Sequence, residues 1–421
     1  MLSRTKRLLR RIYVRDTWRT LSPCDVLLVR HDNDCGYTFR GKAYAHLIDS
    51  FGDLCTKRSL EVRTVAKPLS VLVGKRAYHS PVSYNQADIG IGLFRQAIRL
   101  IKGADFAAQW AKSRRVALWG DILNKAKPKI VVGIQPDEYL CHAGKKIGIP
   151  VYDLQHGVIA DEHPWYGEKY RMSTPTEDLP DGFLCWDEQS VATIAKWASK
   201  KDVRVIEVGN PWFLRFIQED PDDDLVHEAV AQWKTHNGAQ PSILVSLQWG
   251  RLQSEISSNG IIVDALEKVI LGTANKYNWI LRLHPVQLRG EEREIVLKYL
   301  TDTFGAEKAQ KWLKSSQDPL PIVLRQVDLH ITYNSTIVIE AAWMGVRSII
   351  LDQNIREGGN SESYFTHERS IGMVKDLPLD PNTIKQWIVN TLAKGRAEPT
   401  LRDSSQALDA FIDEIVTRCR S

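Results

Sequence analysis

Two segments in the second half of the chain place polar residues directly after short apolar runs, at 279–283 and 329–333. Such runs are typical of buried parallel strands, and residues that start helices follow the second run. Backbone N–H groups at a strand-to-helix junction attract an anion such as phosphate. The candidate binding residues at the two junctions are Arg282, His284 and Pro285 in the first, and Asn334, Ser335 and Thr336 in the second. The pattern favours a phosphate site; the alternative is an ordinary capped helix beside a surface histidine.

Glu340 lies one turn into the helix that the spacing predicts from Ile337 to Met344, and Gly345 is a natural stop for that helix. A carboxylate in this position could accept hydrogen bonds from both hydroxyls of a ribose. His284, at the tip of the neighbouring strand, could donate to a phosphate. The two junctions together therefore indicate a nucleotide site.

A second polar cluster occupies the loop 155–167, which follows the strand predicted at 150–154. Gly157 allows the backbone to turn sharply there. The side chains suited to act as general acid, general base or nucleophile are His156, Asp161, Glu162 and His163. Glu162 is the leading candidate and His156 the competing base, while the structural alternative is a loop that is merely polar.

Strands and helices alternate along both halves of the chain. The predicted strands are 25–29, 61–65, 129–134, 150–154, 182–186, 203–208, 242–247 and 347–352, with two more ending at His284 and Asn334. The main predicted helices are 44–54, 91–101, 106–124, 139–147, 261–277, 383–392 and 407–418. This alternation predicts doubly wound parallel α/β sheets, in which ligands lie beyond the carboxyl ends of the strands.

Composition and length set the class of protein. A chain of 421 residues suggests two or three domains. A domain boundary is predicted between 21–212 and 213–421. It is indicated by a turn-forming segment at 209–212 and an acidic segment at 218–224. Hydrophobic and charged fractions of 43% and 25% are those of a soluble globular protein, and no apolar stretch suits a secretory signal. The six cysteines form no C-x-x-C pair, so neither a disulfide framework nor a zinc site is expected, and the cytoplasm is the expected compartment.

The charge of the chain is concentrated at its start. A net charge of +5 is too small to indicate a nucleic-acid partner. The segment 1–20 alternates basic and apolar residues, and as a helix it could lie on an anionic membrane surface. The alternative is a solvated terminus.

Several motifs resemble those of GT-B glycosyltransferases, which are built from two Rossmann-like halves. Residues 282–285 with 334–336 resemble the His-Pro and serine/threonine motifs of bacterial sialyl- and polysialyltransferases, and of CDP-glycerol glycerophosphotransferases. The segment around Glu340 resembles the nucleotide-binding helix of GT-B enzymes, whose glutamate binds ribose. Gly209-Asn210-Pro211 is similar to the interdomain motif of UDP-N-acetylglucosamine 2-epimerases, and 155–157 resembles loops of capsule and O-antigen proteins, a group that includes β-Kdo transferases.

This resemblance implies a GT-B fold, with two Rossmann-like domains facing across a cleft. It implies a bacterial glycosyltransferase that builds a surface polysaccharide such as capsule or lipopolysaccharide. The implied donor is a nucleotide-sugar. CMP-activated Kdo or sialic acid is preferred to a UDP-sugar, and the implied acceptor is a growing or lipid-linked glycan. Neither a metal nor another cofactor is implied.

Departures from the family pattern leave alternatives open. The large retaining GT-B families carry a second glutamate, and here Asp352 falls too late to match it. The serine pair of the related motif appears as Ser335-Thr336. The nucleotide base and the anomeric outcome therefore stay open. Three alternative functions also stay open: a nucleotide-sugar epimerase, a CDP-glycerol-type phosphotransferase and an inactive polysaccharide-assembly protein. No Gly-x-Gly-x-x-Gly follows the first strand, which argues against a dinucleotide oxidoreductase.

Overall fold

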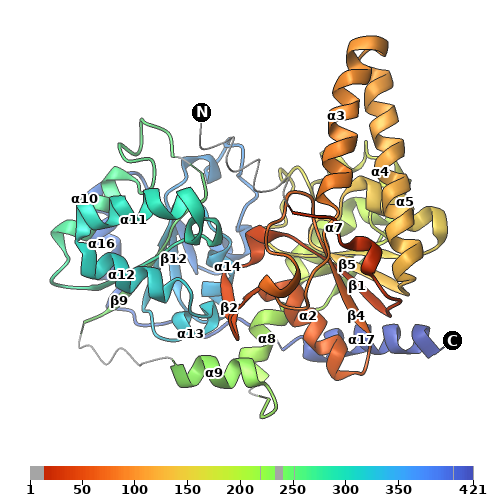
Figure 1. Ribbon diagram of the computed structural model, residues 1–421. Coiled ribbons are helices and arrows are strands. Elements are labelled where there is room, and N and C mark those ends of the chain that lie inside the picture. The colour runs from red at the N-terminus through yellow and green to blue at the C-terminus, as the bar shows by residue number, and fades with distance from the viewer. Residues whose placement is uncertain (1–13, 219, 233–239, 251, 402, 421) are drawn as a thin grey trace. The chain divides into compact units, whose positions relative to one another are not determined.

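A computed structural model describes residues 14–420 except 219, 233–239, 251 and 402. Its described residues divide into two compact units. Among the described residues, the first unit comprises 14–159, 164–214 and 404–420, and the second comprises 160–163 and 215–403. Each unit is built around its own parallel sheet with helices on both faces, so both are Rossmann-like (Figure 1).

The first unit contains a six-stranded sheet in the order β4-β1-β5-β6-β7-β8, and every pairing in it is parallel. The strands are β1 (Val26–Arg30), β4 (Val62–Ala66), β5 (Ile130–Gly133), β6 (Val151–Leu154), β7 (Gly182–Cys185) and β8 (Arg204–Glu207), and a separate hairpin is formed by β2 (Tyr37–Phe39) and β3 (Lys42–Tyr44). The helices are α2 (His46–Lys57), α3 (Asn85–Lys102), α4 (Ala104–Ala126), α5 (Glu138–Ile147), α6 (Glu168–Arg171), α7 (Glu188–Ala198) and α17 (Ser405–Arg420). The division between the two units, after residue 214, falls within α8 (Pro211–Gln218). All six predicted strands of this half are present.

The order of these strands creates a switch point. From β1 the chain crosses to β4 on one side, and it later returns to β5 on the other side of β1. Crossovers therefore leave the carboxyl ends of β1 and β5 in opposite directions, which opens a crevice between them. Central strands of such sheets are buried on both faces, and Val26 to Val29 are at most 1% exposed.

The second unit contains a five-stranded parallel sheet in the order β10-β9-β11-β12-β13. Its strands are β9 (Ser242–Ser246), β10 (Asn278–Arg282), β11 (Leu329–Thr332), β12 (Arg347–Ile350) and β13 (Val374–Asp376). Its helices are α9 (Asp224–Gln232), α10 (Asp264–Gly272), α11 (Gly290–Phe304), α12 (Ala306–Ser315), α13 (Leu320–Leu324), α14 (Ile337–Trp343), α15 (Thr366–Ser370) and α16 (Pro381–Leu392). The chain crosses from β9 to β10 on one side and then to β11 on the other, so the switch point lies between β9 and β11.

Helix α17 belongs to the first unit, although chain order had assigned 404–421 to the second domain. The apolar face of α17 is the reason. The ring of Phe411 lies 5.2 Å from that of Tyr152 in β6 and 6.3 Å from that of Phe51 in α2. Asp409 pairs with Arg58 at 2.8 Å. Chain order gives no hint of this return, because it depends on contacts more than 250 positions apart.

The basic segment predicted at the N-terminus is described only from residue 14 onward; 1–13 lie outside the described residues. Trp18 is buried, and the N–H of Thr17 donates to the Ser83 carbonyl at 2.8 Å. Residues 17–21 therefore pack on the first unit. Of the helices that the structure describes, none is long and apolar enough to cross a membrane.

Smaller differences from prediction have local causes. The hairpin of β2 and β3 and the edge strand β13 were not predicted, because strands of three residues leave too little pattern. Helix α10 ends at Gly272 rather than at 277, and α3 begins at Asn85 rather than at 91.

Candidate functional site

The carboxyl ends of three neighbouring strands in the second unit are joined by side-chain amides. Gln248, two residues beyond β9, donates to the backbone carbonyl of Asn334 beyond β11. The Gln287 amide donates to the Gln248 carbonyl at 2.8 Å, and Gln287 also accepts from the backbone N–H of His284 at 2.8 Å. These bonds fix the loops at the switch point, where a ligand of a doubly wound sheet binds.

His284 is held in one orientation at this edge. Its Nδ1 accepts a hydrogen bond from the Val286 N–H at 3.2 Å, so the neutral ring carries its proton on Nε2. The ring stacks on Trp249, with centroids 6.4 Å apart and an interplanar angle of 21°. Trp249 is 57% exposed. An oriented N–H donor beside an accessible aromatic face suits a phosphate next to a flat or apolar group.

Glu340 is a buried carboxyl group in the first turn of α14 and is 6% exposed. Burial raises its pKa to about 8, and the positive charge of Arg282 opposes that rise. Arg282 is partly buried; desolvation lowers its pKa to about 10, and its guanidinium donates to the Ser315 carbonyl at 3.1 Å. Arg282 thus lies within electrostatic range of Glu340, and its hydrogen bond is directed to the backbone of Ser315 rather than toward Asn334.

The junction between β11 and α14 is held by side chains more than by its helix. Ser335 Oγ accepts from the Ile337 N–H at 3.3 Å, whereas the side chain of Thr336, the N-cap residue, makes no capping bond. The α14 helix has seven residues, so its dipole is small. Asn334 is oriented instead by Asp352: the side-chain amide of Asn334 donates a hydrogen bond to the Asp352 carboxylate at 2.8 Å. The helix was predicted to run to Met344 and ends one residue earlier, at Trp343. Gly345 follows the C-cap residue, with φ of +73°, and a Cβ there would lie 2.2 Å from the Ala397 carbonyl oxygen.

The first unit has a second polar cluster at its own switch point. Lys67, directly after β4, donates its ammonium to the Gln135 carbonyl at 2.6 Å. Gln135 follows β5 with φ of +45°, and its N–H donates to the buried carboxylate of Asp153 at 2.8 Å. Burial lowers the pKa of Lys67, and the charges of Asp137, Asp153 and Asp34 act against that shift. The crevice between β1 and β5 therefore holds a cation with several carboxylates around it.

His156 belongs to this cluster of the first unit. Burial lowers its pKa, and the charged groups that act on it are Asp34, Lys67 and His31. Its Nδ1 is buried without a hydrogen-bond partner among the described residues. The residue before it, Gln155, is fixed by accepting from the Trp186 N–H at 2.7 Å. His156 is thus a neutral imidazole on a rigid segment, the protonation state that a general base needs.

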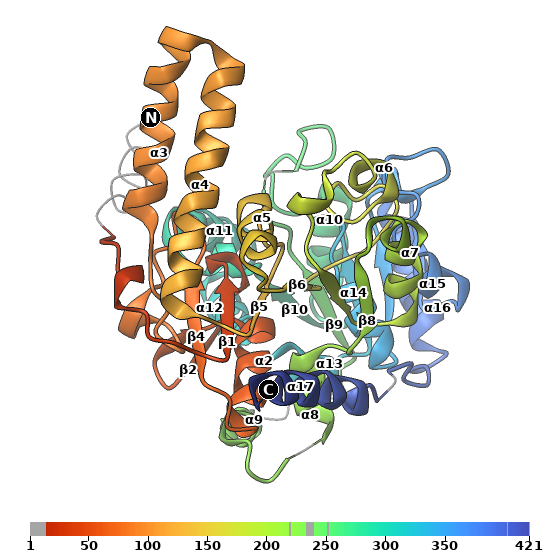
Figure 2. The ribbon, with the colours of Figure 1, turned by 90° about the vertical axis from the view of Figure 1, so that its right-hand side faces the viewer.

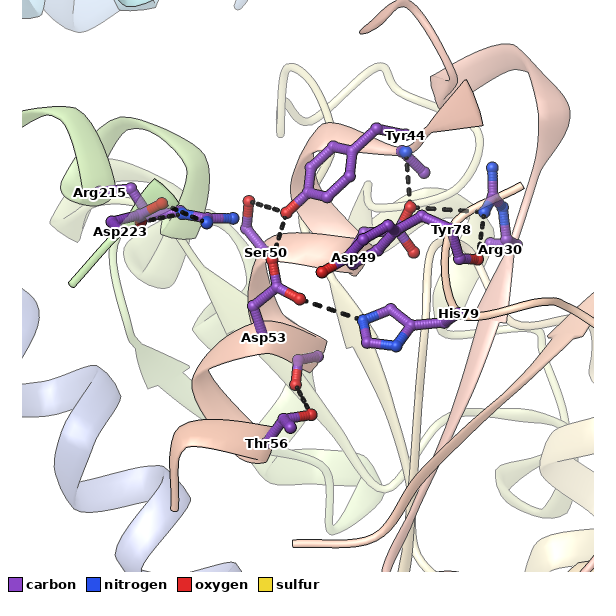
Figure 3. Close-up of polar contacts among 12 residues, drawn as sticks. Arg30, Tyr44, Asp49, Ser50, Asp53, Thr56, Tyr78, His79, Arg215 and Asp223 are labelled. Carbon is purple, nitrogen blue, oxygen red and sulfur yellow. Dashed lines mark hydrogen bonds and ion pairs between the residues drawn. The ribbon is translucent and has the colours of Figure 1, made fainter. Parts of the chain in front are cut away.

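A buried ion pair shapes the loop after β1 that carries His31 and Asp34. Arg30 and Asp49 are both fully buried, with Nη1 and Oδ2 3.4 Å apart, and Arg30 also contacts Cys35. Burial raises the pKa of Asp49 to about 6, although the Arg30 charge opposes this. Figure 3 shows the neighbouring polar contacts, in which Tyr44 donates to Asp53 at 2.8 Å. Because both members of the ion pair are fully buried, the network is structural in character.

The remaining candidates of the 155–167 loop group with the second unit. Ser363 donates its N–H to the Glu162 carboxylate at 3.3 Å and its hydroxyl to the same oxygen, while Ser363 Oγ accepts from the Asp161 N–H at 3.1 Å. His163 stacks on Tyr364, with ring centroids 6.4 Å apart. The structure therefore separates the predicted acid/base loop into His156 in one unit and 161–163 in the other.

Several residues at these edges escaped the sequence analysis as site candidates. They are Gln248, Trp249 and Asp352 in the second unit, and Lys67, His31 and Asp34 in the first. Each lies within four residues of the end of a strand. That position is the signal that could have found them, since ligand sites of such sheets gather at the carboxyl ends. In the part of the chain that the structure describes, no group of three or more His, Cys, Asp or Glu side chains is arranged to hold a metal ion.

No protein-family model matches the chain, and no curated protein matches it either. Its structure is similar to solved ones. UDP-GlcNAc 2-epimerase from Neisseria meningitidis, bound to UDP-GlcNAc, aligns with a TM-score of 0.51 and 13% identity over 93% of this chain and 100% of that one. The UDP-GlcNAc 2-epimerase from Methanocaldococcus jannaschii aligns with a TM-score of 0.53 and 10% identity, over 93% of this chain and 99% of that one. The wall teichoic acid polymerase TagF aligns with a TM-score of 0.53 and 12% identity, over 100% of this chain and 96% of that one. At these identities the similarity establishes the fold: the chain has the predicted α/β GT-B fold with two Rossmann-like domains.

Proposed function

We propose that the second unit binds a nucleotide-activated donor at the switch point between β9 and β11, and that the protein is a glycosyltransferase. The observation that carries this proposal is the convergence of an oriented imidazole donor, His284, and a buried carboxyl group, Glu340, at that edge of one sheet. His284 donates to a phosphate oxygen, and Glu340 accepts from the ribose hydroxyls. The solved relatives in fold include an epimerase bound to UDP-GlcNAc, which supports a nucleotide-sugar as the ligand class.

The proposed reaction transfers a sugar from a CMP-activated donor such as Kdo or sialic acid to a growing or lipid-linked glycan. In glycosyl transfer, oxocarbenium character develops on the sugar and negative charge develops on the departing phosphate. Preorganised donors stabilise that charge; here they are the Nε2 proton of His284 and the backbone N–H groups around Ser335 and Thr336.

The acceptor hydroxyl needs a base, and His156 is the better supported candidate. Burial lowers its pKa, so the imidazole is neutral and able to accept a proton at neutral pH. Glu162 stays an alternative, but its carboxylate already accepts two hydrogen bonds from Ser363. Asp161 and His163 are proposed to hold this loop in place beside 363–364.

Product analysis tests the reaction. The purified protein is incubated with CMP-Kdo, CMP-sialic acid, UDP-GlcNAc or CDP-glycerol, with and without a lipid-linked glycan acceptor. The proposal predicts acceptor-dependent release of CMP with an elongated glycan, in the presence of EDTA. Conversion of UDP-GlcNAc to its 2-epimer without an acceptor would identify an epimerase instead. Acceptor-dependent release of CMP from CDP-glycerol would identify a glycerophosphotransferase.

A further inference from the structure

The helical hairpin of α3 and α4 projects from the sheet of the first unit, and its far end is the turn at Gly103 (Figures 1 and 2). The end nearest the sheet is firmly attached. The Asp16 carboxylate accepts the N–H groups of Gln86 and Ala87 at 2.7 and 2.9 Å, which caps α3. Trp119, in the last two turns of α4, is buried in the core beside Tyr84. The base of the hairpin is therefore anchored to the first unit by hydrogen bonds and core packing.

The far end of this hairpin exposes large apolar side chains. Among the described residues, five of the fourteen exposed large hydrophobic side chains lie between 93 and 106. Their exposed fractions are 69% for Leu93, 65% for Phe94, 89% for Leu100, 80% for Ile101 and 45% for Phe106. Apolar side chains scattered singly on a surface need no explanation, but a contiguous group marks an interaction site.

The exposed side chains form one face of α3. Leu93, Ala97, Leu100 and Ile101 follow the spacing i, i+4, i+7 and i+8, which places them along one side of a helix. Ile98 lies on a different side and is only partly exposed. An exposed apolar stripe of this kind is unfavourable in water, since burying one such side chain is worth about 1.5–3 kcal/mol.

Basic residues accompany the stripe. Arg95, Arg99, Lys102 and Arg114 are all exposed, and Asp105 is the one acidic residue between 93 and 114. The Lys102 ammonium lies 4.7 Å from the centroid of the Phe106 ring. A long basic side chain next to an aromatic ring is the arrangement that interfacial helices use, with the apolar part among lipid tails and the charge at the headgroups.

We infer that the far end of the α3–α4 hairpin, residues 93–106, docks on a membrane surface that carries anionic lipids. Charge decides between this partner and a second copy of the chain, because two copies packed through this end would bring their arginines and lysines together. The projecting shape presents the stripe to a flat and deformable surface. The inference does not rest on the proposed nucleotide chemistry, and it concerns a different segment from the basic N-terminus.

Vesicle sedimentation of the full chain tests this inference. Wild type is expected to pellet with phosphatidylcholine vesicles that contain phosphatidylglycerol, and less with phosphatidylcholine alone. The triple variant Leu93→Gln, Leu100→Gln, Ile101→Gln should lose at least about tenfold in vesicle affinity. Its thermal unfolding should be unchanged, because all three side chains are exposed. The matched control is Leu271→Gln with Val389→Gln, at positions that are 49% and 54% exposed in the second unit, and this control should pellet like wild type.

A second variant isolates the role of charge. Arg95→Gln with Arg99→Gln should weaken binding to the anionic vesicles and leave the small binding to neutral vesicles as it is. The inference is overturned if the triple variant pellets as wild type does, or if wild type binds neutral and anionic vesicles equally. It is also overturned, in favour of self-association, if wild type ignores vesicles but forms a dimer in sedimentation velocity that the triple variant loses.

Discussion

Gln248 donates its side-chain amide to the backbone carbonyl of Asn334, which ties the loops after β9 and β11 at the switch point of the second sheet. The same glutamine accepts through its own carbonyl from Gln287, the partner of His284. Gln248 thus connects the two polar junctions that the sequence singled out, through its side chain to Asn334 and through its backbone carbonyl to Gln287. The geometry of the proposed nucleotide site depends on this connection.

Replacing Gln248 tests that dependence. Gln248→Leu keeps the volume but removes the amide, so the Asn334 loop loses its tie while His284 and Glu340 are unchanged. Nucleotide affinity should fall by about tenfold, which corresponds to about one lost hydrogen bond. Isothermal titration calorimetry measures this loss. Unchanged affinity would show that the loops keep their positions without the tie.

His284→Ala should weaken nucleotide binding by about tenfold or more, because a hydrogen bond to a charged phosphate contributes about 1.5–3 kcal/mol. The fold should persist, since His284 lies at a strand tip outside the hydrophobic core. His227→Ala, at an exposed histidine of α9, is the matched control and should bind as wild type does. Equal affinity in both variants would remove the phosphate role of His284.

Glu340→Gln should change stability and affinity in opposite directions. Burial raises the pKa of Glu340 to about 8 in the folded state, against about 4.3 in an unfolded chain. The folded protein holds this proton more tightly, so the group stabilises the fold below about pH 4.3, and that stability is lost as pH rises through 8. At pH 7 the amide avoids the loss, and the free energy of unfolding should increase by on the order of 2 kcal/mol. Urea unfolding measures it, and a less stable variant would contradict the account.

Nucleotide binding to wild type should also depend on pH through Glu340. Ribose hydroxyls donate to the ionised carboxylate, so binding below pH 8 should release a proton. Affinity should therefore rise from pH 6 to pH 8, and calorimetry in buffers of different ionisation enthalpy should report the released proton. In Glu340→Gln both effects should vanish. Persistence of the same pH dependence in the variant would assign it to another group.

Three substitutions separate the candidates for the base. His156→Gln should lower turnover by about 10² or more with nucleotide affinity unchanged, if the imidazole accepts the acceptor proton. Glu162→Gln is compared with Ser363→Ala, which removes the hydroxyl that donates to Glu162. Equal, modest losses in these two variants would give Glu162 a positioning role. A loss of about 10² in Glu162→Gln alone would make Glu162 the base instead.

The basic N-terminus needs a deletion that spares the fold. Asp16 caps α3 and Trp18 is buried, so a cut beyond residue 15 would disturb the first unit. Deleting 1–13 should reduce binding to anionic vesicles at low salt, since lysines and arginines act through a screened surface potential. Equal sedimentation of the truncated and full chains would limit membrane contact to other segments.

The sequence predicted the parallel strands of both sheets because each is a short apolar run bounded by polar residues, as at 242–247 and 329–333. The edge strand β13 has three residues and escaped this pattern. The sequence also predicted that His284 and Asn334 would lie at strand ends, because each follows directly after an apolar run. Contacts between residues of different strands could not be predicted in this way. The pairing of Gln248 with Asn334, the placement of Lys67 beside His156, and the return of α17 to the first unit all depend on strand order. Strand order is set by long-range packing that a single sequence does not display.

Calorimetric titration tests the claim that the second unit binds a nucleotide between β9 and β11. Wild type, His284→Ala and Glu340→Gln are each titrated with CMP, CDP, UDP and GDP. We expect wild type to bind one of these nucleotides at one site per chain, with CMP strongest, and each variant to lose about tenfold or more in affinity. If none of the four nucleotides binds wild type, or if both variants bind as tightly as wild type, the claim is contradicted.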